Sequence, residues 1–192
     1  MKLRTKMLKP FRKVPVLNAA NVLLVENEEH LHSRLADIIV QNEKDVNITV
    51  RLARKLPLPV ENQDSRPRID LVVFIVNLMS ERSVQSAEQS VRYLDSGFFL
   101  GKVCFLVTGA RCLSVSSTRL LTVRKMASSL HCPLLFAEDQ TSEGVIAAAV
   151  RLLGILKVAA GLVPFATGLS LNSVTHCILP SDLEQNLDSP TC

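Results

Sequence analysis

Three carboxylates follow the first apolar run of the sequence, at a place where α/β proteins often bind phosphate. Residues 21–25 predict a strand, and Glu26-Asn27-Glu28-Glu29 leads from it into a segment with helical spacing. In nucleotide-binding proteins this turn holds glycines, whose backbone N–H groups surround the phosphate, and a lysine that neutralises its charge. Carboxylates would instead repel a triphosphate. The sequence therefore combines a phosphate-binding architecture with the wrong charge.

The residues that define a phosphate-binding loop, GxxxxGK followed by Ser or Thr, are almost all replaced. When the motif is placed directly after Val25, Glu26 takes the first glycine position. Leu31 takes the second glycine position and His32 the lysine position, and only Ser33 keeps its type. A leucine resists the positive φ that glycine accepts, and a histidine supplies less positive charge than a lysine at pH 7. We therefore expect no binding or hydrolysis of GTP.

The same loop is also suited to starting a helix without a ligand. Asn27 is a favourable residue before a helix, because its side chain can accept a hydrogen bond from the exposed backbone N–H groups there. Glu28 and Glu29 in the first turn would each favour the helix dipole by roughly 0.3–1 kcal/mol. His30 and His32 are two residues apart and so do not share a helical face. We expect neither a metal site nor a cofactor.

A second degenerate set of positions follows a later buried strand. A guanine-binding site would carry N-K-x-D there, whereas this chain has Thr108-Gly109-Ala110-Arg111, with a basic residue at the base-reading position. The chain also resembles a bacterial receiver domain, but Asn77 stands at the phosphate-accepting position and cannot form an acyl phosphate. A degenerate receiver-like or nucleotide-binding regulator, which uses the acidic loop with Mg²⁺, stays open as the alternative function.

The elements that must position these residues alternate along the chain. Short apolar runs predict strands, and longer segments with an apolar spacing of three to four residues predict helices. The runs LVVFIVNL and KVCFLV are apolar throughout, as in strands buried on both faces. We expect a single doubly wound α/β domain with a mainly parallel sheet. Strands are expected near 21–25, 47–53, 71–77, 102–107 and 133–137, and helices near 28–41, 82–95, 117–130 and 143–160.

Charge is distributed unevenly along the chain. The 192 residues are 47% hydrophobic, which is enough for one packed core. Six lysines and arginines among the first 13 residues exceed the net charge of +4, so the remainder is slightly acidic. We expect a flexible basic arm over residues 1–15, the α/β domain over 16–172 and a polar tail over 173–192. The arm is a candidate for a DNA contact, which would weaken steeply with salt.

Cysteine spacing and hydropathy exclude several classes of protein. The five cysteines include no CxxC pair, which argues against a zinc site or a disulfide framework and favours a reducing compartment. Residues 158–181 carry no charged side chain, but Gly161, Pro164 and Gly168 make this segment a poor bilayer helix. We expect neither a transmembrane segment nor a secretory signal.

Four stretches in combination point to a family. LPLP, RPRIDLVVFIVNL, FFLGKVCFLVTGA and CPLLFAED resemble sequences of the centromere protein M family, over about residues 14–171. The resemblance implies a small-GTPase-like fold that has lost nucleotide binding and is not an enzyme. It also implies a nuclear subunit of the inner kinetochore, within the constitutive centromere-associated network. There it would assemble with centromere proteins I, H and K and keep centromere protein I stable.

If the phosphate site is inert, function must lie in a surface. SGFFLGK places three large apolar residues in a helix-to-strand connection that is normally polar. Such residues are frequent interface anchors, but they also cap cores, and both interpretations stay open. The apolar segment after the last helix is the second candidate surface, with packing on the sheet edge as its alternative. The candidate partner-binding residues are Phe98, Phe99, Leu100, Leu162, Phe165, Leu169 and Leu171.

Overall fold

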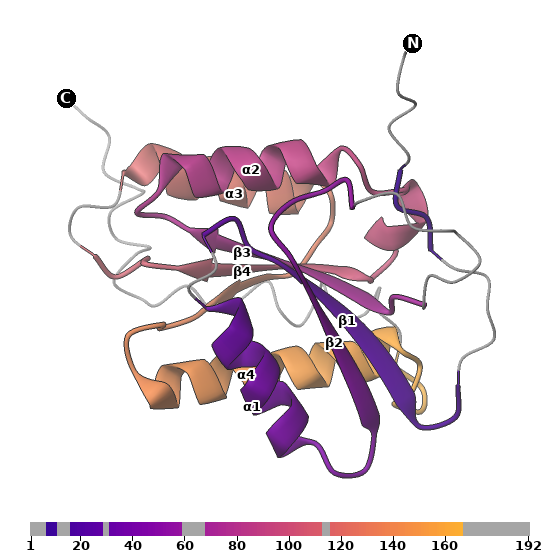
Figure 1. Ribbon diagram of the computed structural model, residues 1–192. Helices are drawn as coiled ribbons and strands as arrows, with labels where there is room; N and C mark the ends of the chain where they lie inside the picture. Colours follow the sequence, from indigo (N-terminus) through magenta and orange to yellow (C-terminus); the bar gives the residue numbers. More distant parts are fainter. Residues whose placement is uncertain (1–6, 11–15, 29–30, 59–67, 113–115, 167–192) are drawn as a thin grey trace.

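A computed structural model describes residues 7–10, 16–28, 31–58, 68–112 and 116–166 (Figure 1). Strands and helices alternate along these residues, except that no described helix lies between the second strand and the third. The strands are β1 (Ala19–Val25), β2 (Asn47–Ala53), β3 (Leu71–Asn77), β4 (Val103–Thr108) and β5 (Leu134–Phe136). The helices are α1 (His32–Asn42), α2 (Glu81–Val91), the short 3₁₀ helix η1 (Ser96–Phe99), α3 (Ser117–Ser129) and α4 (Ser142–Ala159).

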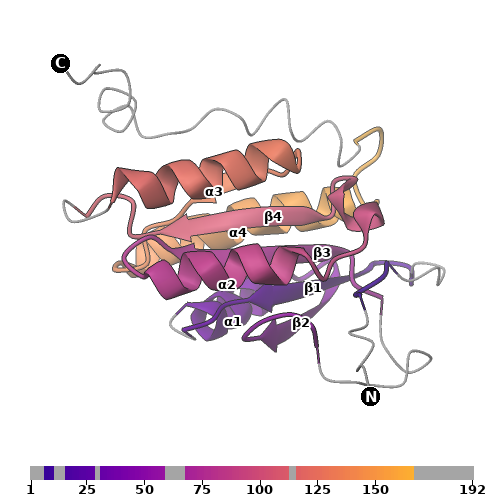
Figure 2. The ribbon, with the colours of Figure 1, turned by 90° about the horizontal axis from the view of Figure 1, so that it is seen from above.

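The five strands form one parallel sheet in the order β2-β1-β3-β4-β5. Helices α2 and α3 cover one face of the sheet, and α1 and α4 cover the other (Figure 1). Figure 2 shows the same layers from above, with β2 at one edge of the sheet. The other edge is β5. The expected doubly wound α/β architecture is confirmed. In such folds ligands bind outside the carboxyl ends of the strands, where the strand order reverses, here between β1 and β3.

Side chains of the central strands alternate between two apolar cores. Val72 and Phe74 of β3 belong to the core shared with α2 and α3, where Phe74 stacks on Phe105 of β4 with ring centroids 5.5 Å apart. Val73 and Ile75 belong to the core shared with α1 and α4. Because both faces of β3 and β4 are covered, their sequences are apolar without alternation, and this is why these two strands were predictable.

Part of the predicted basic arm belongs to the domain. Leu8 is 3% exposed within the core under α2. Its N–H donates to the carbonyl oxygen of Tyr93 (2.7 Å), and its carbonyl accepts from the N–H of Asp95 (2.8 Å). The arm is therefore fixed at residues 7–10, which corrects the prediction of flexibility there. Residues 1–6 and 11–15 of the arm and the tail over 173–192 lie outside the described residues.

Helix α4 is the most apolar of the helices, yet it packs as a core element. Its residues Val145, Ala149 and Leu152 are buried against the sheet, whereas Ile146 and Val150 are 42% and 55% exposed. No helix in the described ranges has the length and hydropathy to cross a membrane. The described part of the uncharged segment 158–181 ends at residue 166, just after α4.

Candidate functional site

The acidic loop is organised around one buried carboxylate, that of Glu26, the first residue after β1. Glu26 is 4% exposed, and its Oε2 accepts hydrogen bonds from the backbone N–H groups of Leu31 (2.9 Å) and His32 (2.7 Å). Its Oε1 accepts a further hydrogen bond from Leu31 N–H (3.1 Å), and His32 Nδ1 lies 2.7 Å from Oε2. Because α1 begins at His32, the carboxylate satisfies N–H groups that have no partner within the helix.

This geometry corrects the predicted start of the helix. Asn27 does not cap α1, and Glu28 lies before the first turn rather than in it, because α1 starts at residue 32 and has no acidic residue in its first turn. The carboxylate of Glu26 reaches from the end of the strand to residues 31 and 32, and so it determines where the helix begins. Glu29 and His30 lie outside the described residues. The amino end of α1, where a phosphate-binding loop would place phosphate, carries a carboxylate of the chain itself.

The other P-loop-like positions contribute to this arrangement or face solvent. Leu31 is 1% exposed and packs in the core shared with α1 and α4, and His32 is 5% exposed beside Glu26. Ser33, the one position that keeps the motif's residue type, is exposed on α1. Glycine is not required here, because the backbone does not bend around a phosphate. Leu31 instead packs in the core, and the N–H groups of residues 31 and 32 bond to Glu26.

The remaining described carboxylate of the loop lies among cationic side chains. Glu28 lines an open hollow at the carboxyl ends of β1 and β2, together with Arg54, Lys55 and Arg82. Its Oε2 is 3.4 Å from Nδ2 of Asn77. Within the described part of the chain, no group of three or more His, Cys, Asp or Glu side chains is placed to hold a metal ion.

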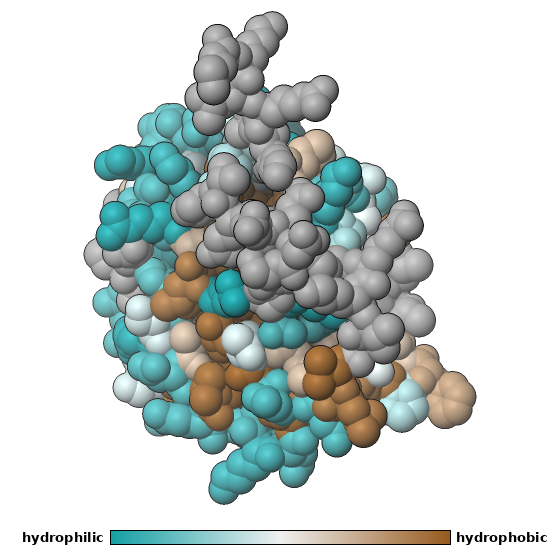
Figure 3. All heavy atoms as spheres, turned by 45° about the vertical axis from the view of Figure 1, so that its right-hand side comes forward, coloured by the Kyte–Doolittle hydropathy of each residue, from teal (hydrophilic) through white to brown (hydrophobic). Residues whose placement is uncertain are grey.

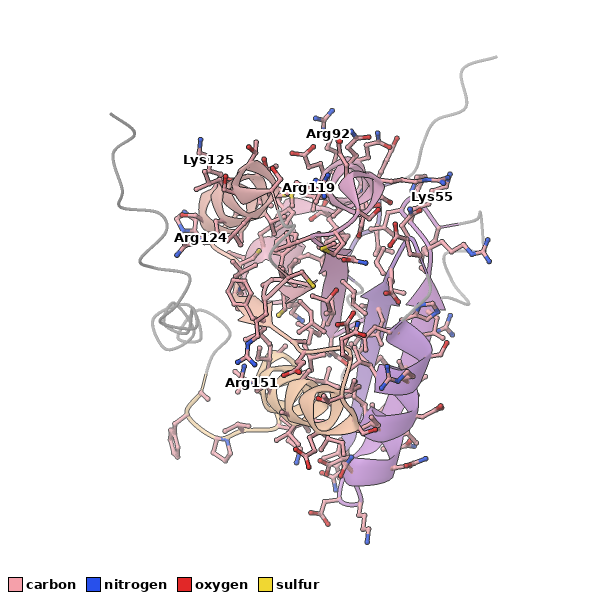
Figure 4. The ribbon with its side chains drawn as sticks, turned by 90° about the vertical axis from the view of Figure 1, so that its left-hand side faces the viewer. Lys55, Arg92, Arg119, Arg124, Lys125 and Arg151 are labelled. Carbon is pink, nitrogen blue, oxygen red and sulfur yellow. The ribbon has the colours of Figure 1, made fainter. Side chains whose placement is uncertain are left out.

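Side chains of the chain also fix the turn after β3. The Oδ1 atom of Asn77 accepts a hydrogen bond from Met79 N–H (2.9 Å), so the residue at the receiver-like acceptor position has a structural role here. Arg119 Nη1 donates to the carbonyl oxygens of Leu78 and Met79, at 2.9 Å each. Figure 4 shows Arg119 reaching from α3 toward α2. This role of Arg119 could not be predicted from the sequence, because nothing local distinguishes Arg119 from the other basic residues of α3.

Gly109 and Arg111, two of the degenerate base-reading positions, border a hollow of about 350 Å³ between the turn after β4 and the start of α4. Thr108 is 2% exposed at the end of β4, and Gly109 has a φ of +73°. A Cβ atom on Gly109 would lie 3.1 Å from the Met79 side chain, so both the conformation and the space favour glycine. Arg111 forms an exposed ion pair with Glu138 (3.3 Å) across this region. Figure 4 shows Arg151 of α4 on the same side of the molecule.

The first candidate surface divides into a buried and an exposed part. Phe98 is fully buried in the core under α2, so this residue caps the core and is not available as a contact. Phe99 is half-buried, and Leu100 is 64% exposed. The Asp95 side chain accepts a hydrogen bond from Gly97 N–H (3.0 Å), which fixes the 3₁₀ turn that presents Leu100. Leu100 therefore stays the strongest partner-binding prediction in this stretch.

The second candidate surface follows α4. Leu162 is half-buried against the core of α1 and α4, whereas Phe165 is fully exposed and has a φ of +61°. Leu169 and Leu171 lie outside the described residues. Figures 1 and 2 place η1 and the end of α4 on the same side of the molecule, and Figure 3 turns this side forward. Hydrophobic side chains are exposed there in separate groups between hydrophilic ones.

Comparison with known proteins identifies the family. The model of the family described as Centromere protein M (CENP-M) matches residues 5–178. Centromere protein M of Danio rerio is 61% identical over 181 residues, which cover 94% of this chain and 97% of the relative. The proteins of the same name from Xenopus laevis and Homo sapiens are 41% and 43% identical, and the matches cover 91% and 87% of this chain and 97% and 92% of the relatives. Because each match spans most of both sequences, the chain belongs to the centromere protein M family.

Proposed function

We propose that this chain is a non-catalytic assembly subunit of the inner kinetochore, located at the centromere of chromosomes in the nucleus. It binds centromere protein I, in one complex with centromere proteins H and K, within the wider centromere-associated network. Family membership supports the centromeric role. The absence of catalysis rests on one structural observation: the buried Glu26 carboxylate satisfies the amino end of α1.

In this proposal the α/β domain is a small-GTPase-like fold in which internal contacts have replaced the nucleotide site. A phosphate at the start of α1 would have to displace a carboxylate that already accepts hydrogen bonds from Leu31 and His32. It would also face the like charge of that carboxylate at short range. At the base-reading position, where a GTPase has a carboxylate that binds guanine, this chain has Arg111, which pairs with Glu138. Between β2 and β3, the described residues 54–58 and 68–70 contain no further strand or helix that could act as a nucleotide switch.

The alternative of a Mg²⁺-dependent regulator has less support. Magnesium prefers oxygen ligands in near-ideal octahedral geometry. Both oxygens of Glu26 accept hydrogen bonds from the chain, and Glu28 lies beside Arg54, Lys55 and Arg82. A cation at this place would be repelled by those side chains. The geometry therefore favours an assembly role for the fold.

Gel filtration of the full chain with a reconstituted assembly of centromere proteins H, I and K tests the proposal. We expect stoichiometric co-elution in nucleotide-free buffer, and no change when millimolar GTP and Mg²⁺ are added. Failure to co-elute would overturn the assembly role. Co-elution that requires GTP would contradict the second part of the proposal, which is that the chain assembles without binding a nucleotide.

A further inference from the structure

The two edges of the sheet differ in how far they are protected. One edge is β5, which has only three residues, whereas the other is β2, which has seven and pairs with β1 in uninterrupted parallel register from Asn47 to Ala53. Edge strands of soluble proteins are normally short, bulged, interrupted by proline, or covered. β2 contains no proline and no bulge, and no described element lies beyond it in the sheet. Figure 2 shows it at the outer side of the sheet.

The hydrogen-bonding groups of this edge follow from the ladder with β1. Asn47 N–H donates to the carbonyl oxygen of Asn18 (2.8 Å), and Glu26 N–H donates to that of Ala53 (2.9 Å). Since a parallel strand uses every second residue toward one neighbour, the odd-numbered residues of β2 bond to β1. The N–H and C=O groups of the three even-numbered residues therefore point away from the sheet. These residues are Ile48, Val50 and Leu52.

The side chains along the edge define what could pair with it. Ile48 and Val50 are half-buried against the core of α1 and α4, and Leu52 on the same face is 46% exposed. On the opposite face Arg51 is exposed, and it makes no ion pair within the described part of the chain. An added strand would thus need apolar residues at alternate positions on one face and a carboxylate on the other.

From these observations we infer that the β2 edge is a strand-addition site for a partner protein of the centromere assembly. The occupant is an extended segment with apolar residues at alternate positions, which extend the row of Ile48, Val50 and Leu52, and an acidic residue opposite Arg51. Main-chain hydrogen bonds to the outward groups of β2 hold it, as in other strand-addition complexes. The inference rests on the proposed assembly function and adds a third surface to the two candidates at Leu100 and after α4.

Two substitutions at one position separate backbone pairing from side-chain contact. Leu52→Pro removes an outward N–H without touching the ladder to β1, and proline is tolerated at such positions of edge strands. Leu52→Thr removes similar apolar area but keeps the N–H, and its β-branched side chain is favourable in a strand. Affinities for the assembly of centromere proteins H, I and K are measured for both, after circular dichroism and thermal unfolding confirm the fold. We expect binding by Leu52→Pro to be about tenfold weaker than by Leu52→Thr, since a missing backbone hydrogen bond and the proline ring both oppose pairing.

Hydrogen exchange gives an independent readout that needs no variant. In the free wild-type chain, the amides of Thr49 and Arg51 are already protected by β1, whereas those of Ile48, Val50 and Leu52 face solvent. In the complex we expect only the second group to become slower. Binding that leaves the exchange rates of these three amides unchanged would overturn the inference but keep the proposed function. Equal binding by the two Leu52 variants, whether weakened or retained, would have the same consequence. No complex with the wild type would remove both. A homodimer of the free chain that Leu52→Pro dissociates would assign the edge to a second copy and overturn the inference.

Discussion

Replacement of Glu26 by alanine is the most informative perturbation of the loop after β1. The change removes the side chain that accepts hydrogen bonds from the N–H groups of Leu31 and His32, and it takes the carboxylate partner away from the His32 ring nitrogen. All three residues are buried. Glu26→Ala therefore leaves the buried N–H groups at the start of α1 without acceptors, while the apolar cores of the domain stay unchanged.

The expected loss of stability is large for one polar residue. Hydrogen bonds to a charged group contribute about 1.5–3 kcal/mol each, but helix-end N–H groups recover water when the covering side chain is removed. We therefore expect a cost of about 3–5 kcal/mol, the range seen when one member of a buried, hydrogen-bonded charged set is deleted. For a domain of this size that lowers the unfolding midpoint by about 10 °C.

The assay is thermal unfolding at neutral pH, with Glu138→Ala as the matched control. Glu138 also lies at the carboxyl ends of the strands, but its ion pair with Arg111 is exposed. We therefore expect Glu138→Ala to lower the free energy of unfolding by less than about 1 kcal/mol. Formate provides a second readout. It can occupy the vacated anion position at the amino end of α1, and it should raise the midpoint of Glu26→Ala more than chloride of equal ionic strength does.

Two results would refute this reasoning. A loss by Glu26→Ala no larger than that by Glu138→Ala would mean that the carboxylate does not hold the start of α1. An equal response of wild type and Glu26→Ala to formate would mean that the anion does not act at the vacated position. The first result would also remove the structural argument that Glu26 takes the place of a phosphate.

Three further predictions concern the packing, thiol reactivity and pH dependence of the domain. Phe98→Ala should cost about 3–5 kcal/mol in chemical denaturation, because a fully buried aromatic side chain is lost. Burial raises the pKa of the Cys104 thiol, so iodoacetamide at pH 8 should label the exposed Cys112 and spare Cys104 until urea unfolds the chain, as read by peptide mass spectrometry. The hydrogen bond from Lys157 Nζ (2.7 Å) lowers the pKa of Glu43 and ties the end of α1 to α4. Because the pKa of Glu43 is lowered in the folded chain, Lys157→Met should destabilise the domain at neutral pH. The difference from wild type should begin to shrink as the pH falls below about 4.3, the usual pKa of a glutamate, and should vanish only below the lowered pKa of Glu43.

Each of these has an internal comparison. Leu100→Ala is the control for Phe98→Ala, and similar losses for the two would contradict the division of this stretch into core and surface. Labelling of Cys104 as fast as Cys112 in the folded chain would contradict its burial. A stability difference between wild type and Lys157→Met that persists unchanged at acid pH would mean that the charge of Glu43 is not involved.

The fold was predictable from sequence where burial is complete. β3 and β4 are covered on both faces, so their uninterrupted apolar runs identified them within one residue. The start of α1 was not predictable, because local capping rules favour Asn27, whereas the actual cap is Glu26, which reaches residues 31 and 32. Contacts between distant parts of the chain were likewise not predictable, because local sequence patterns do not report which distant residues meet in the fold. The hydrogen bonds of Arg119 to the turn after β3 span about forty residues.

The candidate surface shows a similar limit. Phe98, Phe99 and Leu100 are consecutive and equally apolar, so no periodic pattern distinguishes them. Their exposure is decided by the 3₁₀ turn that Asp95 caps and by Leu8, which fills the core beneath α2. Both Asp95 and Leu8 lie outside the three apolar residues, and Leu8 belongs to the amino-terminal segment. Sequence alone could name the stretch but could not say which residue is exposed.

The affinity of centromere protein I for Leu100→Glu tests the central claim most directly, because it asks whether the fold acts through its surface. Leu121 of α3, a leucine 38% exposed, provides the matched control Leu121→Glu. With folding of both variants confirmed by circular dichroism, we predict wild-type affinity for Leu121→Glu and at least about tenfold weaker binding for Leu100→Glu, since a charge would be buried in an apolar contact. Equal, wild-type binding by both variants would contradict the assignment of this surface, and absence of binding by the wild-type chain would contradict the assembly function itself.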